Sequence, residues 1–182
     1  MKTATAVTGA ETTFGRDEII VSKTDLKGRI TYANPVFQRV SGYRLDELLG
    51  KPHNIIRHPE FPGGVFRLLW QTIEAGQEIF AYVDNLARDG SHYWVLAHVT
   101  PTFGTSGQVV GYHSNRRSPS RTAIAAVSAV YQQMRDIERR HDSAPRAAEA
   151  SLAYLQQFLA EQGTTYEKFV WDVIASSGEL VA

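Results

Sequence analysis

Apolar residues between positions 17 and 120 follow two different periods. Near both ends of this range they alternate with polar residues or form β-branched runs, which predicts half-buried strands. Turn sequences at residues 24–28 and 88–91 separate neighbouring runs and indicate β-hairpins. The predicted strands are residues 18–23, 29–33, 78–87, 92–103 and 108–115.

The residues between the second and third predicted strands follow a helical period instead. Asn34 and Pro35 are typical of a helix N-cap and first turn, and a glycine ends each helical segment. In the longest segment the apolar positions recur at intervals of one and three residues, which gives a single apolar face. The predicted helices are residues 35–41, 44–49 and 63–76.

Two strands, several short helices and a three-stranded meander predict one antiparallel sheet covered by helices on one face. This is an α+β domain, which we place at residues 17–120. Domains of this shape often enclose a ligand between the sheet and the helices. Residues 1–16 are small and polar, which favours a flexible tail or a short cap helix.

Beyond a boundary rich in Pro, Ser and Arg at residues 116–122, the composition becomes alanine-rich and helical. Residues 121–182 are expected to form three amphipathic helices, whose apolar faces must be buried. They can fold back on the sheet, form a dimer interface or dock on a partner. The sequence leaves these three placements open.

Composition narrows the classes of function. Lys plus Arg and Asp plus Glu number 19 each, so the chain has no net charge and gives no argument for nucleic-acid binding. The chain has no cysteine, which excludes disulfides, thiolate metal sites and cysteine nucleophiles. Without an apolar run of ~20 residues or a secretion signal, we expect a cytoplasmic protein with no direct membrane insertion. No catalytic motif is visible, so we expect neither an enzyme nor a metal site.

Residues 53–60 concentrate hydrogen-bonding side chains beside two isoleucines. This combination is typical of a short helical turn that lines a pocket, with the isoleucines packed inward and the polar groups reaching a ligand. A solvated loop bounded by Pro59 explains the same residues. The candidate ligand contacts in this stretch are His53, Asn54, Arg57, His58 and Glu60.

The order of these segments resembles that of a PAS sensor domain over roughly residues 17–120. The resemblance is carried by residues 32–37 (YANPVF), 41–43 (SGY), 47–51 (ELLGK), 88–95 (RDGSHYWV) and 107–112 (GQVVGY). Within PAS domains, residues 54–59 (NIIRHP) and 117–121 (RSPSR) resemble the FAD-binding PAS domain of bacterial aerotaxis receptors. The resemblance implies a PAS fold and a sensor of redox state or oxygen that binds FAD non-covalently.

The same resemblance suggests which residues hold FAD. In that family the Arg-His-Pro sequence is needed for FAD binding, which implies roles for Arg57 and His58. The family usually has an aspartate after the proline, and here that position is Glu60. Asn54 and the N-cap residue Asn34 complete this group of candidate FAD contacts.

Light-sensing flavin PAS domains offer a second comparison. Their adduct-forming cysteine falls at His53, so their photochemistry is absent. Their flavin-contacting asparagine is kept as Asn85, whereas a second asparagine falls at Val95. Their last-strand glutamine falls at His113, which could donate a hydrogen bond to a flavin ring.

Further aromatic and cationic residues have competing interpretations. Trp70 lies on an apolar helix face, so core packing is the default and an aromatic contact to flavin the alternative. If Asn85 and Val95 face inward, strand alternation places Trp94 outside, against a flanking helix or a dimer partner. Arg116 and Arg117 are most simply a solvated strand end.

Two other functions compete with the FAD sensor. A haem-binding gas sensor would use His53, His58 or His113 as axial ligand. A ligand-free PAS module would serve dimerisation and partner docking. Aerotaxis receptors continue into a membrane anchor and a signalling coiled coil, and neither follows before Ala182. We therefore expect either signalling to a separate partner or homodimer, or a truncated chain.

Overall fold

The computed structural model describes residues 6–179. Its centre is one five-stranded antiparallel sheet with strand order β2-β1-β5-β4-β3. The five predicted strands and the α+β architecture are confirmed. The strands are β1 Ile20–Thr24, β2 Ile30–Ala33, β3 Ile79–Leu86, β4 His92–Phe103 and β5 Val109–Arg117.

Four short helical segments between β2 and β3 cover the inner face of the sheet, the face toward which Val83 and Val95 point. They are α1 Pro35–Ser41, α2 Leu45–Leu48, the 3-10 helix η1 His53–Ile56 and α3 Gly63–Glu74. Helix α1 ends where predicted because Gly42 adopts a left-handed conformation with φ of 72°. The polar stretch at residues 53–60 begins with the helical turn that we expected.

Asn34 is confirmed as the N-cap of α1, and this role occupies its whole side chain. Its Oδ1 accepts hydrogen bonds from Phe37 N and Val21 N, each at 3.0 Å. Its Nδ2 donates to the Ile19 carbonyl at 2.8 Å. The structure therefore gives Asn34 a backbone-capping role away from the cavity described below, and not the ligand contact that we expected.

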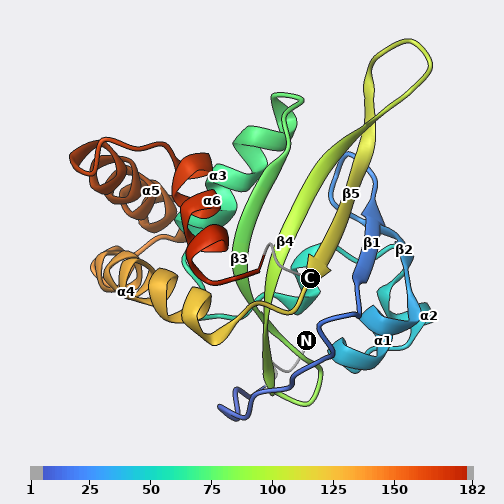
Figure 1. The fold of residues 1–182 in the computed structure, drawn as a ribbon. Helices are drawn as coiled ribbons and strands as arrows, with labels where there is room; N and C mark the ends of the chain where they lie inside the picture. The colour runs from blue at the N-terminus through green and yellow to red at the C-terminus, as the bar shows by residue number, and fades with distance from the viewer. Residues whose placement is uncertain (1–5, 180–182) are drawn as a thin grey trace.

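The C-terminal helices are α4 Arg121–Glu138, α5 Ala144–Glu161 and α6 Tyr166–Ser176. Helices α4 and α6 lie beside β3, and α5 packs against α3 and α4 (Figure 1). Trp94 of β4 stacks on Tyr131 of α4, with ring centroids 6.4 Å apart and planes 11° apart. Phe80 of β3 lies 5.0 Å from the ring of Trp171 of α6. The expected outward position of Trp94 against a flanking helix is thus observed.

Buried tyrosines tie β3 to these helices. Tyr131 Oη donates to the Tyr82 carbonyl at 2.9 Å, and Tyr82 Oη donates to Glu179 Oε2 at 2.7 Å. Glu179 also accepts from the backbone N–H of Ser120, which is the N-cap of α4. The beginning of α4 and the end of α6 therefore meet on the outer face of β3.

Helix α5 packs closely on the first turn of α3. A Cβ on Gly64 would lie 2.6 Å from the backbone nitrogen of Leu152, so only glycine permits this approach. The N–H of Gly64 also points at Glu138 Oε1 and Ser151 Oγ, both at 3.1 Å. The C-terminal helices therefore contact the helix that lines the cavity.

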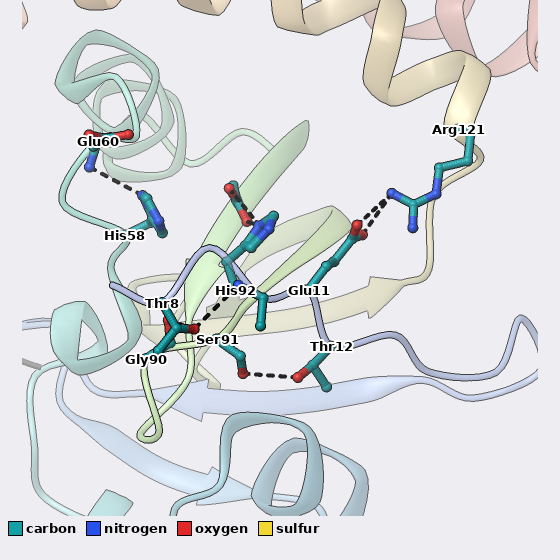
Figure 2. Close-up of polar contacts among 11 residues, drawn as sticks. Thr8, Glu11, Thr12, His58, Glu60, Gly90, Ser91, His92 and Arg121 are labelled. Atoms are coloured by element: carbon teal, nitrogen blue, oxygen red, sulfur yellow. Dashed lines mark hydrogen bonds and ion pairs between the residues drawn. The ribbon is translucent and has the colours of Figure 1, made fainter. Parts of the chain in front are cut away.

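Residues 6–16 differ from the tail or cap helix that we expected. They run as an extended segment beside the start of β4 (Figure 2). His92 N donates to the Ala10 carbonyl and Thr12 N donates to the His92 carbonyl, both at 2.8 Å. Glu11 forms an ion pair with Arg121 at the start of α4 at 2.7 Å. Unpaired backbone groups on β4 thus explain the order of this segment, and residues 1–5 lie outside the described range.

Strand β5 continues to Arg117, further than the sequence predicts. Its pairing with β1 and β4 turns Tyr112, Ser114 and Arg116 toward the inner face. Arg117 is exposed as expected. The solvated position expected for Arg116 is wrong, because its side chain points into the domain and the residue is only 3% exposed.

Candidate functional site

A cavity of about 390 Å³ lies between the inner face of the sheet and the segment from η1 to α3. Much of its wall is apolar, because the inward positions of β3 and β4 are small or branched and α3 contributes its apolar face. This part of the wall includes Ile56, Leu69, Ile73, Val83, Val95 and Val99. A cavity of this size and lining is typical of a small-molecule site.

The charged side chains that line the cavity all belong to basic residues. They are Lys27, Arg57, Arg67 and Arg116, and no aspartate or glutamate lines it in the described part of the chain. A cavity with this charge pattern favours a ligand that is anionic or rich in hydrogen-bond acceptors.

Arg57 is solvent-exposed and therefore lies at the mouth of the cavity. Its guanidinium carbon lies 4.7 Å from the ring centre of Phe66. Desolvation lowers the pKa of Arg57, and the carboxylate of Glu138 partly offsets this effect. Asn54 lines the same region, and its carbonyl accepts from the backbone N–H of Arg57 at 3.1 Å. The predicted pair Asn54 and Arg57 thus belongs to one turn at the entrance.

Asn85 faces the cavity from β3 and is 4% exposed. Its Nδ2 has no hydrogen-bond partner among residues 6–179, and neither does the hydroxyl of the buried Tyr93 opposite it. Buried polar groups are nearly always paired, so an unpaired donor that faces a cavity indicates a missing partner. An acceptor on a bound ligand would satisfy Asn85.

The deep end of the cavity contains Arg116, His53 and Ser22. The Nη2 of Arg116 donates to Ser22 Oγ and lies 3.3 Å from His53 Nε2, which in turn lies 3.1 Å from Ser22 Oγ. Burial lowers the pKa of His53 to about 3, and Arg116 acts in the same direction. His53 is therefore neutral at physiological pH.

Trp70 forms part of the cavity wall, where it also packs against protein. Its ring lies edge-on to Tyr112 at 5.6 Å. A Cβ on Gly28 would lie 2.9 Å from Cη2 of Trp70, so glycine at position 28 makes room for the indole. The two interpretations of Trp70, core packing and ligand contact, are therefore compatible. One side of its indole packs on the protein, and the other side faces the cavity.

His58 and Glu60 do not line this cavity. They border a separate small hollow together with Asp84 and Trp94. His58 Nδ1 accepts from the backbone N–H of Glu60 at 3.2 Å (Figure 2), which is the turn-capping alternative to a ligand contact. Desolvation lowers the pKa of His58, and the charge of Asp84 partly offsets this. His58 therefore caps the turn at residues 58–60, directly after Arg57, and does not line the cavity.

His113 lies at the edge of the cavity, but strand alternation directs its ring to the other face of the sheet. The inward neighbours on β5 are Tyr112 and Ser114. The Nε2 of His113 lies 3.1 Å from Oδ1 of Asn115, its neighbour on the same face. The structure therefore does not place the His113 ring where a ligand in the cavity would meet it.

Two other kinds of site are not observed in residues 6–179. No group of three or more His, Cys, Asp or Glu side chains is arranged to hold a metal ion. No helix in this range is both long and apolar enough to cross a membrane.

Comparison with known proteins adds evidence that is independent of this geometry. A family model described as the PAS fold matches residues 30–116. The aerotaxis receptor of Escherichia coli (strain K12) is 41% identical over 125 residues, which are 69% of this chain and 24% of the receptor. The nitrogen fixation regulatory protein of Klebsiella pneumoniae is 33% identical over 102 residues, 56% of this chain and 21% of that protein. The chain thus spans less than a quarter of either relative.

Among solved structures, the dark state of the blue-light photoreceptor Aureochrome1 LOV has a TM-score of 0.55 at 23% identity. The match covers 65% of this chain and 86% of that one. At this level of identity the similarity establishes the fold alone.

Proposed function

We propose that this chain, whose residues 30–116 belong to the PAS fold family, binds FAD non-covalently and reports redox state or oxygen to a partner. The PAS fold and the similarity to an aerotaxis receptor are findings. We propose in addition the cofactor, the signal and the partner.

One observation carries the cofactor assignment. Two buried donors at the cavity, Asn85 Nδ2 and Arg116 Nη1, have no hydrogen-bond partner among residues 6–179, and Arg57 lies at the entrance. FAD has an acceptor-rich ring edge and a negatively charged pyrophosphate, which suit a deep donor set and a cationic mouth, respectively. The residues present therefore fit FAD.

Bound FAD would supply reversible electron transfer, and the chain would supply binding and orientation. Arg57 would hold the pyrophosphate and Asn85 the ring edge. Trp70 would cover one side of the aromatic system. His58 would support Arg57 indirectly, because it caps the adjoining turn by accepting from the backbone N–H of Glu60.

The route to a partner would run through β4 and α4. Val95 of β4 lines the cavity, and the adjacent Trp94 stacks on Tyr131 of α4. One face of β4 meets the cavity and the other meets α4. A change in the charge or hydrogen bonding of the ligand would therefore shift β4 and, through it, α4. We place this sensor in the cytoplasm, with a signalling protein or a second copy of the chain as the recipient.

The absorption spectrum of the purified protein tests this proposal. Paired flavin bands, release of FAD on denaturation and bleaching on anaerobic reduction are the expected results. A sharp Soret band would overturn it in favour of haem. A colourless protein that cannot be reconstituted with FAD would overturn it in favour of a ligand-free interaction module.

A further inference from the structure

Within residues 6–179, Arg116 is a buried cation without a counter-charge. Its Nε donates to Ser114 Oγ at 3.0 Å, and its Nη2 donates to Ser22 Oγ. Its guanidinium carbon lies 4.7 Å from the ring centre of Phe37. Its Nη1 is buried without a hydrogen-bond partner, and no carboxylate in residues 6–179 forms an ion pair with it.

Such an arrangement is costly to the protein. A buried charge pays a large desolvation penalty that neutral partners offset only in part. Burial lowers the pKa of Arg116 to about 10, so the guanidinium stays charged at physiological pH. The neighbouring His53 is neutral and supplies no negative charge. Within the described chain, the deep end of the cavity therefore carries an uncompensated positive charge.

We propose that Arg116 recognises the deep end of the bound ligand, and that the ligand presents an electronegative edge there. This inference rests on the proposed function and deepens it. With FAD, the edge is that of the ring system, whose carbonyl and ring-nitrogen acceptors match Arg116 Nη1 and Asn85 Nδ2. The phosphates remain at the mouth with Arg57.

The competing role for Arg116 is structural, as a cross-link between β1 and β5 through Ser22 and Ser114. The two roles predict opposite changes in the ligand-free protein. Removing an uncompensated buried charge relieves its desolvation penalty, so an apolar side chain of similar length should leave the stability equal or higher. Removing a structural cross-link is destabilising, because it leaves buried hydroxyls unpaired.

The experiment compares Arg116→Met with Arg117→Met, the exposed neighbour on the same strand. Fluorescence titration measures the affinities for FAD and riboflavin, and thermal unfolding is recorded without ligand. Arg116→Met should weaken both ligands by roughly ten- to hundredfold, the range for a hydrogen bond to a charged group. Its ligand-free unfolding midpoint should equal or exceed that of the wild type. Arg117→Met should change neither quantity, and Arg116→Lys should restore part of the affinity.

Three outcomes would overturn the inference. These are wild-type affinity in Arg116→Met, a loss for FAD but not for riboflavin, or a lower ligand-free midpoint. The second would assign Arg116 to the phosphates, and the third to the structural cross-link.

A further readout is the midpoint potential of the bound flavin at saturating FAD. It should become more negative in Arg116→Met, because a nearby positive charge favours the electron-rich reduced form. An unchanged potential would contradict a contact with the ring. If the wild type binds neither flavin, the proposed function fails, and the ligand-free unfolding comparison still decides whether Arg116 is an uncompensated charge.

Discussion

Replacing Arg57 by alanine should separate the two ends of the ligand. The side chain is exposed at the cavity mouth and packs over Phe66, so it can reach a pyrophosphate without supporting the core. We expect Arg57→Ala to weaken FAD and leave riboflavin, which lacks phosphate, nearly unchanged.

The magnitude follows from the solvent exposure of Arg57. Two unit charges about 4 Å apart attract by roughly 1 kcal/mol in water and roughly 4 kcal/mol at an effective dielectric constant of 20. An exposed side chain lies toward the lower value, and about 1–2 kcal/mol corresponds to a loss of roughly five- to thirtyfold in FAD affinity. Added salt should weaken FAD binding to the wild type more than to the variant.

Equilibrium titration of the ligand-free protein with FAD and with riboflavin is the assay. Arg146→Ala is the matched control, because Arg146 is exposed on α5 and does not line the cavity. Equal losses for FAD and riboflavin would refute the assignment of Arg57 to the phosphates. Unchanged FAD affinity would place Arg57 outside the binding site altogether.

Three further predictions concern the deep end of the cavity and the contact of α3 with the C-terminal helices. Burial lowers the pKa of His53 to about 3 in the folded chain, whereas a solvated histidine in the unfolded chain has a pKa of 6.5. As the pH falls below 6.5, the unfolded chain therefore binds a proton that the folded chain does not. His53 should therefore lower the unfolding free energy by about 1.4 kcal/mol per pH unit below that value, and His53→Asn should flatten the dependence in urea unfolding at pH 7, 6 and 5. Glu138→Gln should tighten FAD binding severalfold, because it removes a negative charge near Arg57. The control Glu149→Gln, at an exposed position of α5, should have no effect in the same titration. Equal FAD affinities of the wild type and Glu138→Gln would argue against this coupling. Gly64→Ala places a methyl group 2.6 Å from the backbone of α5 and should cost about 1–3 kcal/mol, visible as a drop of several degrees in the unfolding midpoint; an unchanged midpoint would contradict the close packing.

The sequence predicts the sheet and its middle strands well, because their signals are local. Alternation along β3 and β4 is enough to place Asn85 and Val95 inside and Trp94 outside, and the structure agrees. The cap at Asn34 and the glycine stops are likewise encoded within a few residues of each helix end.

Local alternation does not determine which side chains of β5 point inward. Placing His113 inward commits Arg116 to the outside, because residues of opposite parity point to opposite faces. The pairing of β5 with β1 and β4 sets the other parity, with an irregularity near Thr102 and Phe103. This register depends on distant strands, so the most informative residue of the cavity was missed. The alternation of Tyr112, Ser114 and Arg116 was the available signal.

Two other differences have a similar origin in long-range contacts. His58 turns back to the N–H of Glu60 and borders a different hollow, which the density of polar residues in the stretch could not reveal. The segment at residues 6–16 is held by backbone pairing with His92 of β4 and by the ion pair of Glu11 with Arg121, both partners at least eighty positions away in the chain. Partners at such separations are not encoded in local composition.

The proposed link from the cavity to the C-terminal helices can be tested by amide hydrogen exchange of the FAD-loaded protein in the oxidised and the anaerobically reduced states. We expect the flavin bands to bleach on reduction and amide exchange to change in β4 around Trp94 and in α4 around Tyr131. The exposed end of α5 near Arg146 should serve as the internal reference. Bleaching with identical exchange in β4 and α4 would contradict the claim that the cavity reports its redox state through the C-terminal helices.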